Sequence, residues 1–84
     1  MKARVTVYPR REILDPQGKA IREALARVGF EEVREVRAGK SFEIDLGDVE
    51  AARAGERLRE MCERLLANTV VEEYEVDLEG PARP

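Results

Sequence analysis

Residues 14–29, LDPQGKAIREALARVG, mark both ends of one amphipathic helix, and this constrains the fold more than any other stretch of the chain. Asp15 is a suitable N-cap, and Pro16 follows at the first helical position, where its missing N–H costs nothing. Apolar side chains then recur at helical spacing, at Ile21, Ala24, Leu25 and Val28. Gly29 follows as a helix-ending residue. The sequence predicts a helix over about 16–28 with one apolar face.

Alternating patterns predict a strand near each end of the chain. Residues 3–8, ARVTVY, alternate apolar and polar side chains, and Pro9 ends the run because it has no N–H for a sheet. Residues 70–78, VVEEYEVDL, place acids between apolar side chains, with three of them predicted to face inward: Tyr74, Val76 and Leu78. Both segments are typical of strands with one buried face.

Residues 33–46, VREVRAGKSFEIDL, also have strand character, but they are too many for one ordinary strand of about five or six residues. Val33 and Val36 cannot share one face of a regular strand, because three residues separate them, so the segment bulges or bends. Two interpretations remain open. The segment is a hairpin of two strands that turns at Ala38 and Gly39, or it is one long strand bent near Gly39.

A second helix is predicted over about 49–67. Its apolar residues form one stripe, made of Ala54, Leu58, Met61, Cys62 and Leu65. Asn68 follows as a good terminator. Taking the hairpin interpretation, the order is β-α-β-β-α-β, which predicts an α+β fold: a ferredoxin-like sandwich, with an antiparallel sheet and two helices on one face. We expect a single domain over 1–79 and a loose C-terminal tail at 80–84.

The chain offers few groups for catalysis. It has no histidine and one cysteine, which excludes Ser-His and Cys-His nucleophiles and zinc sites built on those residues. Cys62 lies late in the second helix on its apolar stripe, so we expect it to pack in the core. Four acids of the outer sheet face could converge on magnesium, but such acids are more often only solvated: Glu43, Asp45, Glu73 and Asp77. No catalytic, cofactor-binding or metal-ligating residue is predicted.

Charge and hydropathy exclude two classes of partner. Charged residues make up 39% of the 84-residue chain, but they are interleaved and the net charge is only −3, which argues against nucleic acid. No apolar run approaches the roughly 18 residues of a membrane span. The single cysteine excludes an internal disulfide and fits a reducing compartment, and the N-terminal residues lack the apolar core of a signal peptide, so a cytoplasmic location is expected.

The loop before the first helix carries Arg10 and Arg11. These guanidinium groups could hold an anion beside the positive end of the helix, although two solvated arginines explain the pattern as well. The residues alone therefore indicate a binding module, and a free-standing ferredoxin-like ligand sensor is one form that it could take.

Several longer stretches together resemble the PurS family, the small subunits of phosphoribosylformylglycinamidine synthase. These stretches are VTVYPRREILDPQGKAIREAL at 5–25, the ribbon at 33–46, and EMCERLLANTVVEEYEV at 60–76. The resemblance implies a non-catalytic accessory subunit of a glutamine- and ATP-dependent ligase in purine biosynthesis. Such a subunit bridges a large synthetase subunit and a glutaminase subunit and supports ammonia transfer between them.

The resemblance also implies further properties. ATP and magnesium are used by the synthetase subunit, so this chain is expected to bind no cofactor, and it is expected to form a homodimer or a dimer of dimers. Edge strands in the 33–46 segment could pair with a second copy. We expect Arg37 and Lys40 to contact partners there, with Arg10 and Arg11 as candidate contacts to the larger subunit.

Overall fold

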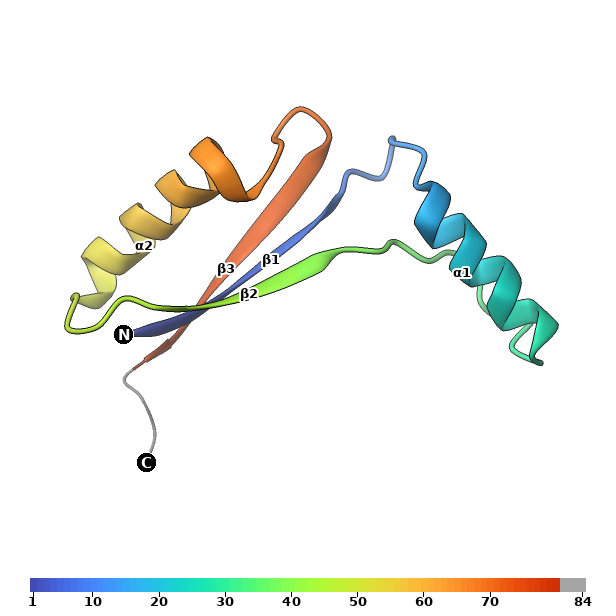
Figure 1. The fold of residues 1–84 in the computed structure, drawn as a ribbon, viewed down its shortest axis with the longest axis horizontal. Helices are drawn as coiled ribbons and strands as arrows, with labels where there is room; N and C mark the ends of the chain where they lie inside the picture. Colours follow the sequence, from blue (N-terminus) through green and yellow to red (C-terminus); the bar gives the residue numbers. More distant parts are fainter. Residues whose placement is uncertain (81–84) are drawn as a thin grey trace.

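The structure is a computed structural model that describes residues 1–80. Three strands form one antiparallel sheet in the order β2-β1-β3. Figure 1 shows the elements, which follow each other along the chain as β1 (Lys2–Pro9), α1 (Pro16–Arg27), β2 (Lys40–Asp45), α2 (Ala51–Met61), a π-helical turn (Cys62–Leu66) and β3 (Glu72–Gly80).

The core lies between the sheet and α2. In the central strand β1, the predicted alternation places Ala3, Val5 and Val7 on the inner face, where all three are fully buried. Val5 pairs with Phe42 of β2 and Val76 of β3, so one apolar row crosses the sheet. Leu58 of α2 and Cys62 of the following π-helical turn cover this row and are also fully buried.

The α+β class and the antiparallel sheet are confirmed, but the order β-α-β-β-α-β with two helices on one face is wrong in detail. Residues 33–39 are extended without pairing to any strand, so the sheet has three strands. Three strands about 4.8 Å apart make a sheet roughly as wide as one helix of about 10 Å. Since α2 occupies that width, α1 has no room on the inner face.

The 33–46 segment is not a hairpin. The single long strand bent near Gly39 is also wrong in its length, because residues 33–39 lead into β2 without pairing and only Lys40–Asp45 form a strand. Gly39 stands close to β1 there: a Cβ added to it would lie 2.5 Å from the carbonyl oxygen of Val7. Strand pairing starts at Lys40, one residue after this close approach.

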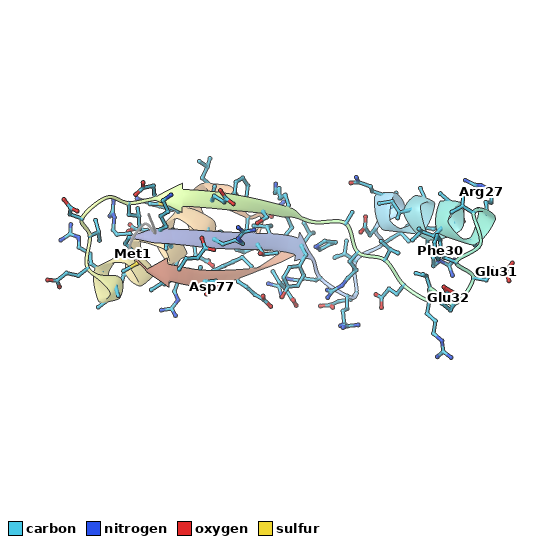
Figure 2. All side chains as sticks on the ribbon, turned by 90° about the horizontal axis from the view of Figure 1, so that it is seen from below. Met1, Arg27, Phe30, Glu31, Glu32 and Asp77 are labelled. Atoms are coloured by element: carbon cyan, nitrogen blue, oxygen red, sulfur yellow. The ribbon has the colours of Figure 1, made fainter. Side chains whose placement is uncertain are left out.

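Residues 10–39, which we call the arm, project beyond the C-terminal end of β1 (Figure 1). The radius of gyration is 16.1 Å, whereas a compact chain of this length has about 12 Å. The molecule measures 47 × 34 × 14 Å. Figure 2 shows that the short dimension runs across the strands, with α1 displaced along the long one.

Two expectations concern the remaining parts of the chain. The tail predicted at 80–84 begins at Gly80, which instead ends β3, and residues 81–84 lie outside the described part.

Among residues 1–80, no helix has both the length and the apolar character needed to cross a membrane.

Candidate partner-binding surface

Asp15 fixes the point where the arm leaves the sheet. Its carboxylate caps α1 by accepting a hydrogen bond of 3.1 Å from the backbone N–H of Gly18. It accepts another, of 2.8 Å, from the N–H of Ala38. Ala38 belongs to residues 33–39, here called the returning segment because they lead from α1 back to the sheet. These backbone donors, that of Gly18 foremost, lower the pKa of Asp15 below its usual value. Asp15, the predicted N-cap of α1, thus also joins the start of α1 to the returning segment.

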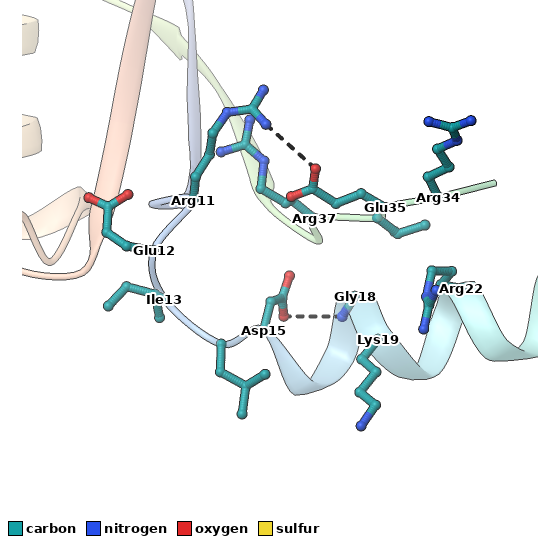
Figure 3. A pocket seen from close by; sticks show the side chains of 12 residues that line it. Arg11, Glu12, Ile13, Asp15, Gly18, Lys19, Arg22, Arg34, Glu35 and Arg37 are labelled. Carbon is teal, nitrogen blue, oxygen red and sulfur yellow. Dashed lines mark hydrogen bonds and ion pairs between the residues drawn. The ribbon is translucent and has the colours of Figure 1, made fainter.

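A cleft of about 400 Å³ opens beside this junction, between α1 and the returning segment (Figure 3). Basic side chains dominate its lining, namely Arg11, Lys19, Arg22, Arg34 and Arg37. Arg11 forms an ion pair of 3.5 Å with Glu35 across the cleft. Three acidic side chains also line it, Glu12, Asp15 and Glu35, so the basic side chains leave the cleft with an excess of positive charge.

Arg10 does not line this cleft. Its backbone N–H donates to Val71, and its guanidinium donates to the carbonyl of Thr69 at 2.9 Å, so it ties the end of β1 to the loop before β3. The side chain also lies 3.8 Å from the Glu73 carboxylate. The structure therefore gives Arg10 an internal role, whereas its candidacy as a partner contact stays a prediction, as does that of Arg11.

Arg37 and Lys40 contact aromatic rings on opposite faces of the sheet. The Arg37 guanidinium donates to the carbonyl of Pro9 at 3.0 Å and lies over the outer-face ring of Tyr8, 4.9 Å from its centroid. The Lys40 ammonium lies 6.0 Å from the centroid of Phe42, on the inner face. Both residues border a shallow second cleft of about 620 Å³.

Tyr8 is held in place on the outer face. Its hydroxyl donates to the Glu75 carboxylate at 3.0 Å, and this hydrogen bond is the main cause that raises the pKa of Tyr8. Tyr8 therefore keeps its proton to higher pH than a free tyrosine does, and Arg37 lies over its ring.

Cys62 packs in the core as predicted. It is fully buried beneath α2, and burial raises the pKa of its thiol. A buried, protonated thiol is a poor nucleophile. Within residues 1–80 no three or more acidic or cysteine side chains gather in a way that could hold a metal ion.

The structure also contains a third cleft, which the sequence did not indicate. A cleft of about 290 Å³, here called the β2 groove, lies between β2 and the end of α2 and is floored by Ile44, Met61, Leu65 and Leu66. Leu65 was expected on the buried stripe but is 83% exposed. The cause is the π-helical turn, closed by a hydrogen bond from Ala67 to Cys62, which changes the direction of the side chains that follow Met61.

Comparison with known proteins gives consistent matches over nearly the whole chain. Residues 2–80 match the model of the PurS family, described as phosphoribosylformylglycinamidine (FGAM) synthase. The subunit PurS of that synthase from Mycobacterium leprae is 44% identical over 79 residues, which cover 94% of this chain and 96% of the relative.

Solved structures agree with this match. PurS of Methanocaldococcus jannaschii, a subunit of formylglycinamide ribonucleotide amidotransferase in the purine biosynthetic pathway, superposes with a TM-score of 0.84 at 34% identity, covering 96% of this chain and 98% of that one. A chain in the structure of PurLQS from Thermotoga maritima gives 0.82 at 36% identity, covering 92% and 95%.

Proposed function

The chain belongs to the PurS family, and we propose that it serves as the small subunit of phosphoribosylformylglycinamidine synthase, a ligase of purine biosynthesis. The observation that carries this proposal is the match over residues 2–80, together with the likeness to a chain of the PurLQS assembly. The subunit role also fits the open clefts described above, which offer surface for contact with a partner.

In the proposed role the chain bridges the large synthetase subunit and the glutaminase subunit and supports the passage of ammonia between them. The basic cleft beside α1, with Arg11 at its mouth, suits an acidic partner surface. ATP and magnesium belong to the synthetase subunit in this proposal, and this chain binds neither. The complex works in the cytoplasm.

Self-association at β2 is part of the same proposal. β2 is an edge strand, and an unpaired edge is a template for a strand of another chain. A second copy adding its own β2 there would make a symmetric pair, with Arg37 and Lys40 close to the contact. Two such pairs would make a dimer of dimers.

Reconstitution tests the subunit role directly. Purified synthetase and glutaminase subunits are assayed for glutamine-dependent formation of formylglycinamidine ribonucleotide, with and without this chain. We expect the rate to rise only when the chain is added, while ammonia-dependent synthesis by the synthetase subunit changes little. An unchanged glutamine-dependent rate would refute the proposal, and saturable binding of an amino acid or nucleotide by the isolated chain would then favour a ligand sensor.

A further inference from the structure

The cleft beside α1 contains three basic side chains whose charge is not offset by an ion pair. Lys19, Arg22 and Arg34 all line it, and within residues 1–80 none of the three forms an ion pair, whereas Arg11 is paired with Glu35. Lys19 and Arg22 stand three residues apart on one face of α1, and Arg34 comes from the returning segment (Figure 3). Like charges gathered in this way repel one another, and an anion bound among them would remove that cost.

The charge of the cleft indicates what kind of anion it suits. Five basic and three acidic side chains line it, so the lining carries two more positive charges than negative ones. A phosphate monoester has a charge of about −1.5 to −2 at neutral pH and offers three strong acceptor oxygens. A carboxylate brings a single charge and two oxygens, which is less than three unpaired cations can bind. The cleft therefore suits a phosphate group.

The size and lining of the cleft favour a small organic molecule over phosphate alone. Its volume of about 400 Å³ lies within the range of roughly 300–1,000 Å³ that is usual for small-molecule sites. The apolar residues Ile13, Leu14 and Val36 also line it, and they give the organic part of a ligand a surface to contact. Because Asp15 holds α1 to the returning segment, the two walls of the cleft are already in place before a ligand arrives.

The N-terminus of α1 is not part of this site. Asp15 caps it, and the carboxylate there would repel a phosphate group. Arg22 follows Asp15 by seven residues, which places it about 10 Å further along the helix axis. The phosphate group is therefore expected at the end of the cleft away from the cap.

We propose that this cleft binds a small organic phosphate monoester, whose phosphate group is held by Lys19, Arg22 and Arg34. All three side chains are exposed, so they can turn toward a ligand, and each guanidinium can donate two parallel hydrogen bonds to phosphate oxygens. The site is made by this chain alone. It goes beyond the proposed subunit role and does not depend on it.

Isothermal titration calorimetry of the full chain at low ionic strength tests the site, with ribose 5-phosphate as the probe. We expect saturable binding at one site per chain, weaker binding of inorganic phosphate, and no binding of ribose. Equal binding of inorganic phosphate and ribose 5-phosphate would support phosphate recognition and overturn the contact with the organic part. No saturable binding of either compound at millimolar concentrations would overturn the site.

Variants of the two arginines test which side chains hold the phosphate group. Arg22→Gln and Arg34→Gln each remove one cation and keep a polar side chain. We expect each to weaken the binding of ribose 5-phosphate by roughly tenfold or more, as the loss of a charged hydrogen bond does. Arg27→Gln is the matched control, because Arg27 also lies on α1 but does not line the cleft, and it should change the affinity by less than about twofold.

The control also separates a specific site from general attraction between charges. The whole chain has a net charge of −3, so general attraction does not favour an anion. If Arg27→Gln weakens binding as much as the two cleft variants do, the three named side chains do not form the site and the proposal is overturned. The titration needs no other subunit, so its result and that of the reconstitution assay are independent.

Discussion

The carbonyl oxygen of Val36 stands 2.0 Å from the position that a Cβ on Gly18 would take. α1 and the returning segment of the arm touch through backbone at this point, and Gly18 is the one buried residue of the helix. Any side chain here forces the two apart. The contact therefore depends on glycine for space and not for an unusual backbone angle.

Gly18→Ala is expected to destabilise the arm by about 1–3 kcal/mol, the usual cost of forcing extra atoms into a packed contact. Gly55→Ala is the matched control, because nothing lies within 4 Å of a Cβ there and the substitution should gain about 0.5–1 kcal/mol in α2. Urea unfolding followed by circular dichroism measures both. Equal effects of the two substitutions would contradict the close contact.

Asp15 should make stability depend on acid. Its pKa is lowered in the folded chain, so its stabilisation is complete above the ordinary carboxyl pKa of about 4 and is lost as the pH falls through the lowered value. Asp15→Asn cannot accept both backbone hydrogen bonds as a carboxylate does. We expect the variant to melt at a lower temperature than the parent chain at neutral pH, and the difference to shrink in acid.

Thermal melts of the two proteins across this pH range provide the check. A constant gap between the two melting curves at all pH values would show that the charge of Asp15 is not what holds Ala38.

Replacing Arg10 and replacing Arg11 should have different effects on the free energy of unfolding. Arg10→Ala removes a half-buried charged hydrogen bond to Thr69 and should cost about 1.5–3 kcal/mol of unfolding free energy. Arg11→Ala removes an exposed ion pair to Glu35 and should change it by less than about 0.5 kcal/mol. In the reconstituted synthase, Arg11→Ala should instead raise the concentration of this chain needed for half-maximal activity. Unchanged half-saturation would remove Arg11 from the proposed contact.

Cys62 should resist thiol reagents in the folded chain and react rapidly in concentrated urea, because it is fully buried and its pKa is raised. Cys62→Ser would bury a hydroxyl group and should destabilise the chain by about 1–3 kcal/mol. Alkylation rates followed by mass spectrometry give the first result. Rapid labelling of the native chain would show that the core around Leu58 opens easily.

Local sequence signals predict well those elements whose ends and buried faces are set by neighbouring residues, such as capping residues or an alternation of apolar and polar side chains. The helix predicted at 16–28 is α1 at Pro16–Arg27, and the alternation at 3–8 is the buried centre of β1. Periodicity shows that a helix has an apolar face, but it does not say what covers that face. The stripe through Ile21 and Val28 predicts a helix packed on the sheet, but the inner face of the three-stranded sheet has no room for α1 beside α2.

Residues 33–46 show that the local sequence also does not determine whether an extended segment pairs into a sheet. Val33 and Val36 have strand-forming side chains, yet whether an extended segment pairs depends on a distant strand, here absent. Half-buried Val36 instead lies against Gly18, a contact between residues eighteen apart. Neither the β2 groove nor the exposure of Leu65 could be expected, because the π-helical turn leaves no clear signature in composition.

The 14 Å thickness of the molecule sets a short path for anything that crosses it. Each broad side is bordered by one outer strand, β2 on one side and β3 on the other (Figure 2). Two large proteins seated against these opposite sides would be separated by little more than the width of the sheet. A reactive small molecule released by one of them would then have only a few molecular diameters to travel before reaching the other.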